Sequence, residues 1–319
     1  MKRLIWILLL CLLPQTAHAL CVGTNLGVVP TPNTFSGSGG EYHVYDTAEY
    51  MQSVNFTVTT GASLGCRYYI VLSAGSSNNQ AQRRLARGLD GATLNYNVYT
   101  NTSHNVLNAT GAYNGANVIS GSFGVVAIGA TNNHTLYWTI APGQVVQHET
   151  ARFEDVNLNL TVMAEFALNV FTPVSKTITF RARAESSVDL SLVDTGGAFS
   201  AADTTQTVDF GDLTSGEFLS YDTLIRSNDG YTLTIQSQKA QTLRHASFPA
   251  ANTSVPYSFS FNGSTLDLSG GGTVTLTTST GLTPAAGSRF PTRFTVGTLS
   301  GLERPGAYQD VLNLTLSAN

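Results

Sequence analysis

One segment of the sequence has the spacing of a catalytic motif. Gly61-Ala62-Ser63-Leu64-Gly65 matches G-x-S-x-G, which in α/β-hydrolases places a serine nucleophile on a sharp turn between a strand and a helix. Here the segment lies between two strand-like runs and directly precedes Cys66. We therefore expect a tight glycine-rich turn, because nothing else in the sequence supports a hydrolase.

Five histidines and two aspartates are the other residues that could do chemistry. None of the histidines has the H-E-x-x-H spacing or another compact metal-binding spacing, and each lies in a polar, turn-like context. Asp155 and Asp310 recur at matched positions of an internal repeat, which indicates a structural role in capping a turn or bridging strands. We therefore expect solvated loop histidines, and no catalytic residue, metal site or cofactor. These five are the histidines that follow the expected signal peptide: His43, His104, His134, His148 and His245.

The N-terminus has the organisation of a secretory signal peptide. Lys2-Arg3 precede the apolar run Leu4–Leu13, and Ala17-His18-Ala19 offers a small-x-small cleavage site. The apolar run is too short for a transmembrane helix, and no later segment approaches the roughly 18 apolar residues that such a helix needs. We expect residues 1–19 to be removed and the rest of the chain to be exported, without a transmembrane segment.

Two of the three cysteines, Cys21 and Cys66, remain after that removal. In an oxidising compartment such a pair usually forms a disulfide. Closing this loop would add roughly 3–4 kcal/mol of stability by the chain-entropy model. The sequence therefore predicts a bridge between the two, with a pair of free thiols as the alternative.

The composition is unusually poor in charge. Charged residues make up 11% of the chain, against about 25% in ordinary globular domains. The net charge is −4, and the sequence has no basic patch for nucleic acid or anionic lipid. Serine, threonine, asparagine and glycine fill the polar positions, which is typical of extracellular β-proteins. Nucleic acid is therefore not an expected partner.

Short runs of alternating apolar and polar residues recur along the chain, as in strands with one buried face. Clusters of Gly, Pro, Asn and Ser separate these runs, which favours an all-β sandwich. The only plausible helix is Gln80–Ala86. The alternating runs include residues 54–59, 94–99, 156–162, 177–181, 188–192, 231–235 and 257–262.

An internal repeat indicates two domains. Arg152–Leu160 echoes Ala307–Leu314, since each contains an aromatic residue, one spacer, Asp-Val and then an alternating apolar run. A Pro-Gly pair stands upstream of each copy. We therefore expect two sandwich domains, residues 20–172 and 173–319, that meet near Thr172-Pro173.

The second copy of the repeat leads into an apolar strand at the C-terminus. Leu312, Leu314 and Leu316 alternate with polar residues after the turn signal Pro305-Gly306. A hydrophobic strand at the edge of a sheet tends to recruit another chain. We expect this edge either to be covered within the molecule or to be filled by a partner.

Several short motifs follow one another in an order that points to a known family. In the N-terminal half they are Cys21, Cys66, Arg84-Leu85-Ala86, Leu94–Tyr99 and Phe153–Val156, and with them this half resembles the spore coat protein U family. The C-terminal half has no cysteine but is similar to the pilin domain of the same family. Two such domains in one chain resemble the tip adhesin of archaic chaperone–usher pili. The motifs of the second half are Val208–Leu213, Arg226–Leu233 and Gly306–Leu316.

The resemblance implies two immunoglobulin-like sandwiches, of which the second lacks its last strand. In such pilins a periplasmic chaperone fills the resulting groove first, and the donor strand of the adjacent subunit then replaces it, which is a form of β-strand addition. One wall of the groove would be the C-terminal strand and the other the first strand of the second domain. The residues expected to line these walls are Leu312, Leu314 and Leu316, and Ile178, Phe180, Val188 and Leu190.

The function that the resemblance implies is that of a non-enzymatic pilus subunit at the tip of a fimbrium. Only Leu20 would precede Cys21, which leaves no N-terminal donor strand and favours the tip position. The chain would pass through the periplasm and an outer-membrane usher to the cell surface, where its first domain would attach to an abiotic or host surface and promote biofilm formation. The alternatives are a structural spore-coat or extracellular matrix protein without a dedicated receptor, and a secreted hydrolase.

Overall fold

The computed structural model describes residues 21–22, 25–28, 33–34, 42–88, 90–108, 116–167, 170–248 and 254–319, and the expected signal peptide lies outside them. The described chain is almost entirely β-structure, as predicted, with a single 3-10 turn, η1 (Gly75–Ser77). The prediction of a helix over Gln80–Ala86 is wrong. Residues 83–86 form strand β7 instead, because Leu85 is buried opposite Leu94 of a neighbouring strand.

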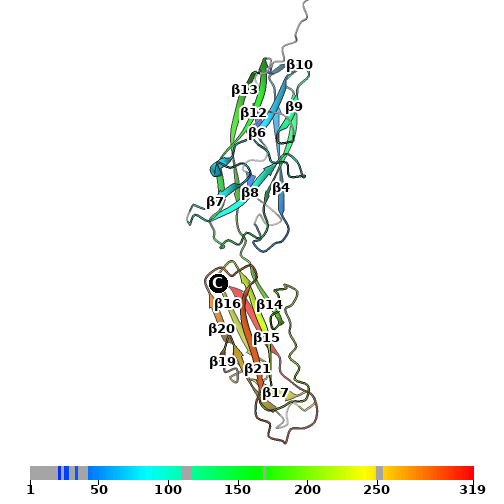
Figure 1. Cartoon of the computed structure of the whole chain (residues 1–319), viewed down its shortest axis with the longest axis vertical. Coiled ribbons are helices and arrows are strands. Elements are labelled where there is room, and N and C mark those ends of the chain that lie inside the picture. Colours follow the sequence, from blue (N-terminus) through cyan, green and yellow to red (C-terminus); the bar gives the residue numbers. More distant parts are fainter. Residues whose placement is uncertain are drawn as a thin grey trace, which may run out of the picture. The chain divides into compact units, whose positions relative to one another are not determined.

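The chain divides into two compact units (Figure 1). Unit 1 contains residues 48–142 and 151–183 and the described residues before His43, whereas unit 2 contains residues 184–319 and the short segments His43–Thr47 and Gly143–Thr150. Unit 1 extends past the expected boundary at Thr172-Pro173. That pair lies inside strand β13 (Val170–Ala182), which is bonded along its length to β12 (Phe153–Ala167). The division therefore falls at Arg183 and Ala184.

The strands of unit 1 form one large and one small sheet. The large sheet has the order β2-β4-β11-β8-β7-β12-β13-β3, with β6 beside β12 and β9 beside β6, and the small sheet has the order β1-β5-β10. The remaining bounds are β1 (Cys21–Val22), β2 (Asn25–Val28), β3 (Asn33–Thr34), β4 (Tyr50–Thr59), β5 (Ala62–Leu64), β6 (Arg67–Leu72), β7 (Arg83–Ala86), β8 (Thr93–Tyr99), β9 (Ile119–Ser122), β10 (Val125–Ile128) and β11 (Thr131–Ile140).

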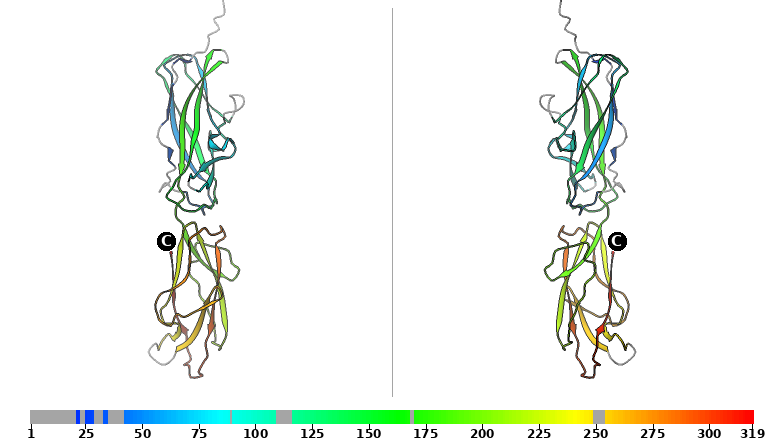
Figure 2. Two further views of the ribbon diagram at one scale, coloured as in Figure 1. Left: turned by 90° about the vertical axis from the view of Figure 1, so that its left-hand side faces the viewer. Right: turned by 90° about the vertical axis from the view of Figure 1, so that its right-hand side faces the viewer.

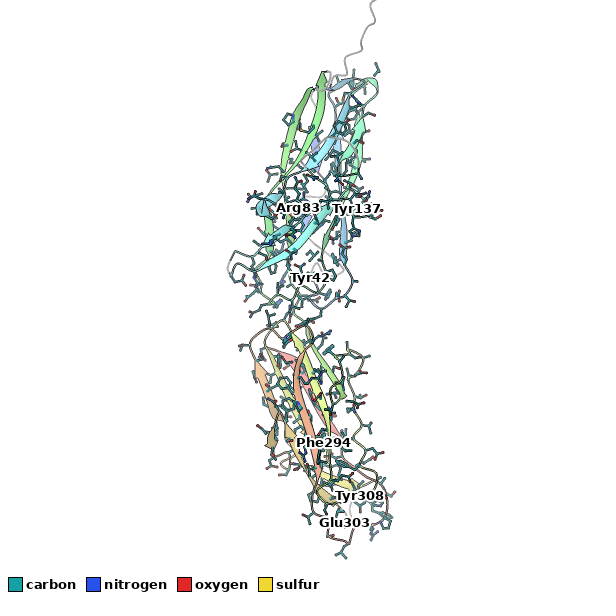
Figure 3. All side chains as sticks on the ribbon, in the orientation of Figure 1. Tyr42, Arg83, Tyr137, Phe294, Glu303 and Tyr308 are labelled. Carbon is teal, nitrogen blue, oxygen red and sulfur yellow. The ribbon has the colours of Figure 1, made fainter. Side chains whose placement is uncertain are left out.

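The interior of unit 1 combines aromatic side chains with two buried arginines, Arg83 and Arg87. The rings of Trp138 and Phe180 lie 4.7 Å apart between centroids, and both side chains are almost fully buried. Arg83 is also buried, in the middle of the unit (Figure 3). Its guanidinium donates to Asn97 Oδ1 over 2.6 Å and to the main-chain oxygen of Leu107 over 2.7 Å. These hydrogen bonds offset the cost of removing the charge from water.

Unit 2 packs a seven-stranded sheet against a three-stranded one (Figure 2). The larger has the order β14-β15-β21-β18-β17-β22 with β19 beside β18, and the smaller has the order β20-β16-β23. Leu233 and Ile235 of β16 face Phe259 and Phe294 in a shared core. The bounds are β14 (Val188–Asp194), β15 (Phe218–Ser227), β16 (Tyr231–Ser237), β17 (Thr242–His245), β18 (Ser254–Phe261), β19 (Ser264–Leu266), β20 (Val274–Ser279), β21 (Ser288–Val296), β22 (Tyr308–Gln309) and β23 (Leu312–Ala318).

Candidate functional site

β14 and β23 are two of the edge strands of unit 2, which pair on one side only. β14 bonds to β15, and β23 bonds to β16. Among the described residues no strand pairs with the other side of either. The two edge strands belong to different sheets and lie close to each other. Unit 2 therefore has a side on which β14 and β23 lie close together with no described strand between them.

The two edge strands run in opposite directions. Val188, at the start of β14, is opposite Ser227, whereas Ala318, at the end of β23, is opposite Tyr231. Ser227 and Tyr231 flank one short turn, so the start of β14 and the end of β23 lie at the same end of unit 2 (Figure 1). A strand placed between them would thus be parallel to one and antiparallel to the other.

The outward side of β14 carries main-chain groups that could bond to a further strand. The N–H of Leu192 points to this side, since it donates to Asp203 O over 2.6 Å. Residues two apart in an antiparallel strand direct their N–H and C=O groups to the same side. Val188 and Leu190 therefore also point outward, and no partner for their main-chain groups occurs in the described part of the chain.

The outward side of β23 has the same property. Gln238 N–H donates to Val311 O over 2.9 Å. The main-chain groups of Val311, Asn313 and Thr315 therefore point toward β16. Leu312, Leu314 and Leu316 alternate with these residues and direct their main-chain groups outward. Backbone donors and acceptors are thus available on both edge strands.

The side chains of the same residues are partly buried and pack against the core of unit 2. The core residues Leu233 and Ile235 on the adjacent β16 are almost completely buried by comparison. A strand added at this side would therefore remove further apolar surface from water. We call these residues the open edge: Val188, Leu190, Leu312, Leu314 and Leu316.

The structure brings together five of the seven residues that the sequence predicted for a groove. Ile178 and Phe180 are the exceptions, because they lie on β13 in unit 1, where they are 5% and 0% exposed. The alternation of apolar residues over 177–181 resumes at 188–192, so the sequence alone does not show that the two runs belong to different units.

Unit 1 holds a strand at the position that corresponds to the open edge. The internal repeat aligns β12 with the β22–β23 region, and Asp155 and Asp310 have matching contacts. Asp155 accepts the hydroxyl of Tyr96 over 2.8 Å and that of Ser76 over 2.9 Å. Asp310 accepts the hydroxyl of Tyr257 over 2.7 Å and, like Asp155, a serine hydroxyl as well. In unit 1, β13 then lies between β12, to which it is antiparallel, and β3, to which it is parallel.

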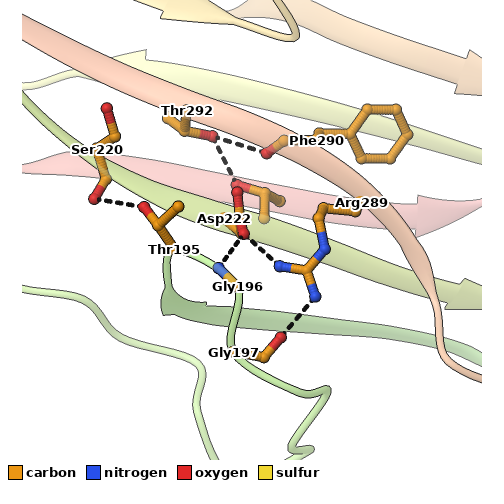
Figure 4. Close-up of polar contacts among 9 residues, drawn as sticks. Thr195, Gly196, Gly197, Ser220, Asp222, Arg289, Phe290 and Thr292 are labelled. Carbon is orange, nitrogen blue, oxygen red and sulfur yellow. Dashed lines mark hydrogen bonds and ion pairs between the residues drawn. The ribbon is translucent and has the colours of Figure 1, made fainter.

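An ion pair fixes β14 to its own sheet (Figure 4). Asp222 of β15 is buried, accepts the N–H of Gly196 over 2.7 Å and pairs with Arg289 of β21. Arg289 also donates to Gly197 O over 2.6 Å. Because these contacts hold the turn that follows β14, the strand keeps its place at the edge of the larger sheet.

The G-x-S-x-G segment does not form a nucleophile elbow. Ser63 is buried in β5, donates its hydroxyl to Gly124 O over 3.1 Å and accepts the N–H of Cys66 over 3.2 Å. Gly65 has a φ of 73°, which a tight turn requires, and the next element is strand β6, whereas an elbow requires a helix. Hydrogen bonds to the main chain thus account for this serine.

The environment of Cys66 is consistent with the expected bridge. Cys66 is fully buried and takes part in a disulfide. β1 pairs with β5 so that Cys21 lies opposite Ser63, three positions before Cys66. The pairing of Cys66 with Cys21 stays a prediction.

Two histidines differ from the expected solvated loop residues. His245 is 4% exposed, and its Nε2 lies 3.1 Å from Pro305 O. His134 lies half-buried in β11 with Nε2 2.7 Å from the Tyr68 hydroxyl, and burial lowers its pKa. Within the residues that the structure describes, no group of three His, Cys, Asp or Glu side chains could hold a metal ion. No helix of that part is long and apolar enough to cross a membrane.

Sequence reasoning missed an exposed apolar pair on β10. Val125 and Ile128 have 73% and 79% of their surfaces exposed. Their strand belongs to the small sheet of unit 1, far along the chain from the open edge. The run of apolar residues over 125–128 was a usable signal, but it is too short to be distinguished from a buried strand.

Comparison with known proteins gives one family and several remote structures. Residues 16–156 match the family model of the Spore Coat Protein U domain. No curated protein matches the sequence. One similar structure is the pre-assembly complex of the chaperone CsuC and the tip adhesion subunit CsuE, from archaic chaperone–usher Csu pili of Acinetobacter baumannii. The identity is 13%, the match covers 86% of this chain and 95% of that chain, and the TM-score is 0.45.

Two further structures are similar at lower scores. The CupB6 tip adhesin of Pseudomonas aeruginosa is 8% identical, with 95% of each chain covered and a TM-score of 0.35. The CooA pilin subunit of enterotoxigenic Escherichia coli is 14% identical and matches 50% of this chain and 98% of its own, with a TM-score of 0.31.

Proposed function

Because residues 16–156 carry a Spore Coat Protein U domain, we propose that the chain is an exported pilus subunit, the tip adhesin of a chaperone–usher fimbria. In this proposal unit 2 accepts a strand, from a periplasmic chaperone first and from the adjacent subunit after assembly at an outer-membrane usher. Unit 1 attaches to a surface and promotes biofilm formation.

The observation that carries the proposal is the difference between the two units at one position. In unit 1, β13 pairs antiparallel with β12 and parallel with β3. In unit 2, β23 and β14 flank the corresponding position and run in opposite directions. A donor strand antiparallel to β23 would be parallel to β14, as β13 is to β3. Such a strand would complete a sandwich of the kind that the chain already forms once.

The energetics favour occupation of the open edge. Full burial of a leucine side chain contributes about 1.5–3 kcal/mol. Leu312, Leu314 and Leu316 are partly exposed, so a donor strand would recover part of this for each, in addition to backbone hydrogen bonds. The cost of ordering the donor offsets some of the gain. An unfilled edge of this kind is also prone to aggregation.

The N-terminal strands support a subunit that accepts a strand and does not supply one. β2 pairs with β4, and β3 pairs with β13, both within unit 1. These strands contribute to the sheet of unit 1, so they are not available as donors while that sheet is intact. The exposed Val125 and Ile128 offer unit 1 an apolar contact for an abiotic surface.

The test is to supply the strand within the chain. The sequence of residues 175–182, which occupies this position in unit 1, is attached after Asn319 through a short flexible linker. We expect the melting temperature of unit 2 to rise, because a gain of 1 kcal/mol raises it by roughly 2–4 °C in a domain of this size. The control extension carries Asn in place of Ile178 and Phe180. Equal melting temperatures for both extensions and the unextended chain would refute strand acceptance.

A matched pair of variants tests the partner. Leu314→Asp places a charge in the middle of the open edge, whereas Thr315→Asp places one on the neighbouring, exposed position. We expect the first to lose co-purification with a pilus chaperone and display at the cell surface, and the second to keep both. If a stable unit 2 binds neither strand nor chaperone, a structural coat or matrix protein becomes the better description.

A further inference from the structure

Unit 1 has a cavity that strand acceptance does not use. Its volume is about 400 Å³, which lies within the range of roughly 300–1,000 Å³ for pockets that bind small ligands. The cavity lies on strands β7 and β8. Side chains with polar or aromatic ends line it, among them Glu49, Gln82, Arg84, Asn95 and Tyr99.

Arg84 is the charged residue of the cavity lining whose side chain could bind a ligand. Its side chain is exposed and has no ion pair or hydrogen-bond partner among the described residues. Arg84 and Asn95 are directly opposite each other in the β7–β8 ladder, so their side chains leave the same face about 5 Å apart. A guanidinium presents paired N–H donors that match a carboxylate. An amide beside it can both donate to and accept from a hydroxyl.

Glu49 gives the cavity an acceptor that is held in place. Its carboxylate lies 2.6 Å from His104 Nε2. The His104 ring in turn packs edge-on against Tyr99, with centroids 4.7 Å apart. The carboxylate thus has a fixed position and keeps a capacity to accept hydroxyl protons. The Tyr99 ring offers an apolar face next to these polar groups.

Two buried residues of the cavity lining are held in place by their strands. Asn97 and Thr139 are 8% and 2% exposed and lie opposite each other in the β8–β11 ladder. The Asn97 side chain accepts from Arg83 over 2.6 Å and donates to Ala81 O over 3.1 Å, which fixes its orientation. Arg84, Asn95 and Tyr99 are thus carried by strands, whereas Glu49 and Gln82 lie in the adjacent loops. A ligand would therefore meet a site whose strand-borne part is preformed.

We infer that this cavity binds a saccharide that carries a carboxylate, a hexuronate. Arg84 receives the carboxylate, and Glu49, Gln82 and Asn95 bind ring hydroxyls. A neutral sugar would leave the guanidinium without a counter-charge, whereas a simple anion would make no contact with Gln82 or Glu49. This inference rests on the proposed attachment role of unit 1, for which it names the class of ligand.

Isothermal titration of the full chain tests the inference, with oligosaccharides of galacturonate and glucuronate as probes and those of galactose and glucose as neutral counterparts. We expect the uronates to bind and the neutral sugars to bind at least tenfold more weakly. Arg84→Ala should weaken uronate binding at least tenfold, because it removes a charge-assisted pair. Arg152→Ala, an exposed arginine of unit 1 outside the cavity, should leave binding unchanged.

Failure of uronate binding, equal binding of neutral sugars, or binding that survives Arg84→Ala would each overturn the inference. These outcomes are distinct from failure of the proposed pilus role, since the strand-extension experiment reports on unit 2. Arg84→Ala should leave the melting temperature of unit 2 and its strand acceptance unchanged.

Discussion

Gly75 lies directly against the carboxylate of Asp155. A Cβ at this glycine would overlap Oδ1 and Oδ2 of Asp155, and its φ of 66° is one that favours glycine. Asp155 itself is fully buried and accepts the main-chain N–H of Ser76 over 3.1 Å. The turn η1 and strand β12 are therefore locked together at the point where the internal repeat begins.

Gly75→Ala should consequently destabilise unit 1. A left-handed backbone costs a residue with a Cβ about 1–2 kcal/mol, and the overlap with Asp155 adds to this, for a loss of roughly 2–4 kcal/mol. Gly91→Ala is the matched control, since Gly91 has a φ of 72° but nothing within 4 Å of an added Cβ. Urea unfolding of both variants measures the difference. Equal losses would mean that the contact with Asp155 has no energetic weight.

The equivalent aspartate of unit 2 gives a prediction about a hydroxyl. Tyr257→Phe removes a donor from Asp310, and the lost hydrogen bond to a charged group should cost about 1.5–3 kcal/mol. Tyr308→Phe is the control, because the Tyr308 hydroxyl donates to Arg304 O at an exposed position. Its loss should be within about 0.5 kcal/mol of zero. Comparable losses for the two variants would contradict a structural role for Asp310.

Alkaline pH should weaken unit 2 through Tyr221. Burial raises the pKa of the Tyr221 hydroxyl to about 12, whereas a tyrosine in an unfolded chain titrates near pH 10. The unfolded state thus loses its proton first, so the stabilisation is complete below about pH 10 and declines as the pH rises to about 12. The free energy of unfolding should fall by up to about 1.4 kcal/mol per pH unit in this window.

Tyr221→Phe isolates that contribution. The variant should show a shallower decline between pH 10 and 12 than the unchanged chain, because it lacks this hydroxyl. Some decline should remain, because burial also raises the pKa of other tyrosines, such as Tyr257. Denaturant unfolding at a series of pH values gives both slopes. Identical slopes would show that Tyr221 ionises equally in the folded and unfolded states.

Features that are local in sequence could be predicted, and those that depend on distant contacts could not. The alternation at Leu312, Leu314 and Leu316 marks a strand with one apolar face, and the repeat around Asp155 and Asp310 marks matched elements. Both signals lie within a few residues. The open edge itself needs β14 and β23 to meet, although more than a hundred residues separate them, and only the fold brings them together.

Two other features could not be predicted from the sequence, for physical reasons. Arg83 lies in the segment for which the sequence predicted a helix. A charged residue is rarely buried, yet six hydrogen bonds to the surrounding chain make the burial of Arg83 possible. The cavity beside Arg84 combines residues from three strands and three loops. No spacing in the sequence relates Glu49 to Arg84.

The division at Arg183 gives a last prediction, about fragments of the chain. A fragment of residues 20–183 retains β13, whereas one of residues 20–172 loses the part that carries Ile178 and Phe180. Each of these side chains contributes about 1.5–3 kcal/mol by burial, and their loss also exposes the edge of β12. We expect the longer fragment to be secreted and to unfold cooperatively, and the shorter one to aggregate.

A peptide of residues 173–183 added to the shorter fragment provides the decisive measurement. If β13 stabilises unit 1 by strand pairing, the peptide should restore solubility and raise the melting temperature in proportion to the logarithm of its concentration. A peptide with Asn at positions 178 and 180 should not. Rescue by the peptide would show that unit 1 without β13 accepts a strand, which is the behaviour that we propose for unit 2. A shorter fragment that folds unaided would show instead that a sandwich of this sequence tolerates an open edge, and the argument for a donor strand in unit 2 would lose its main support.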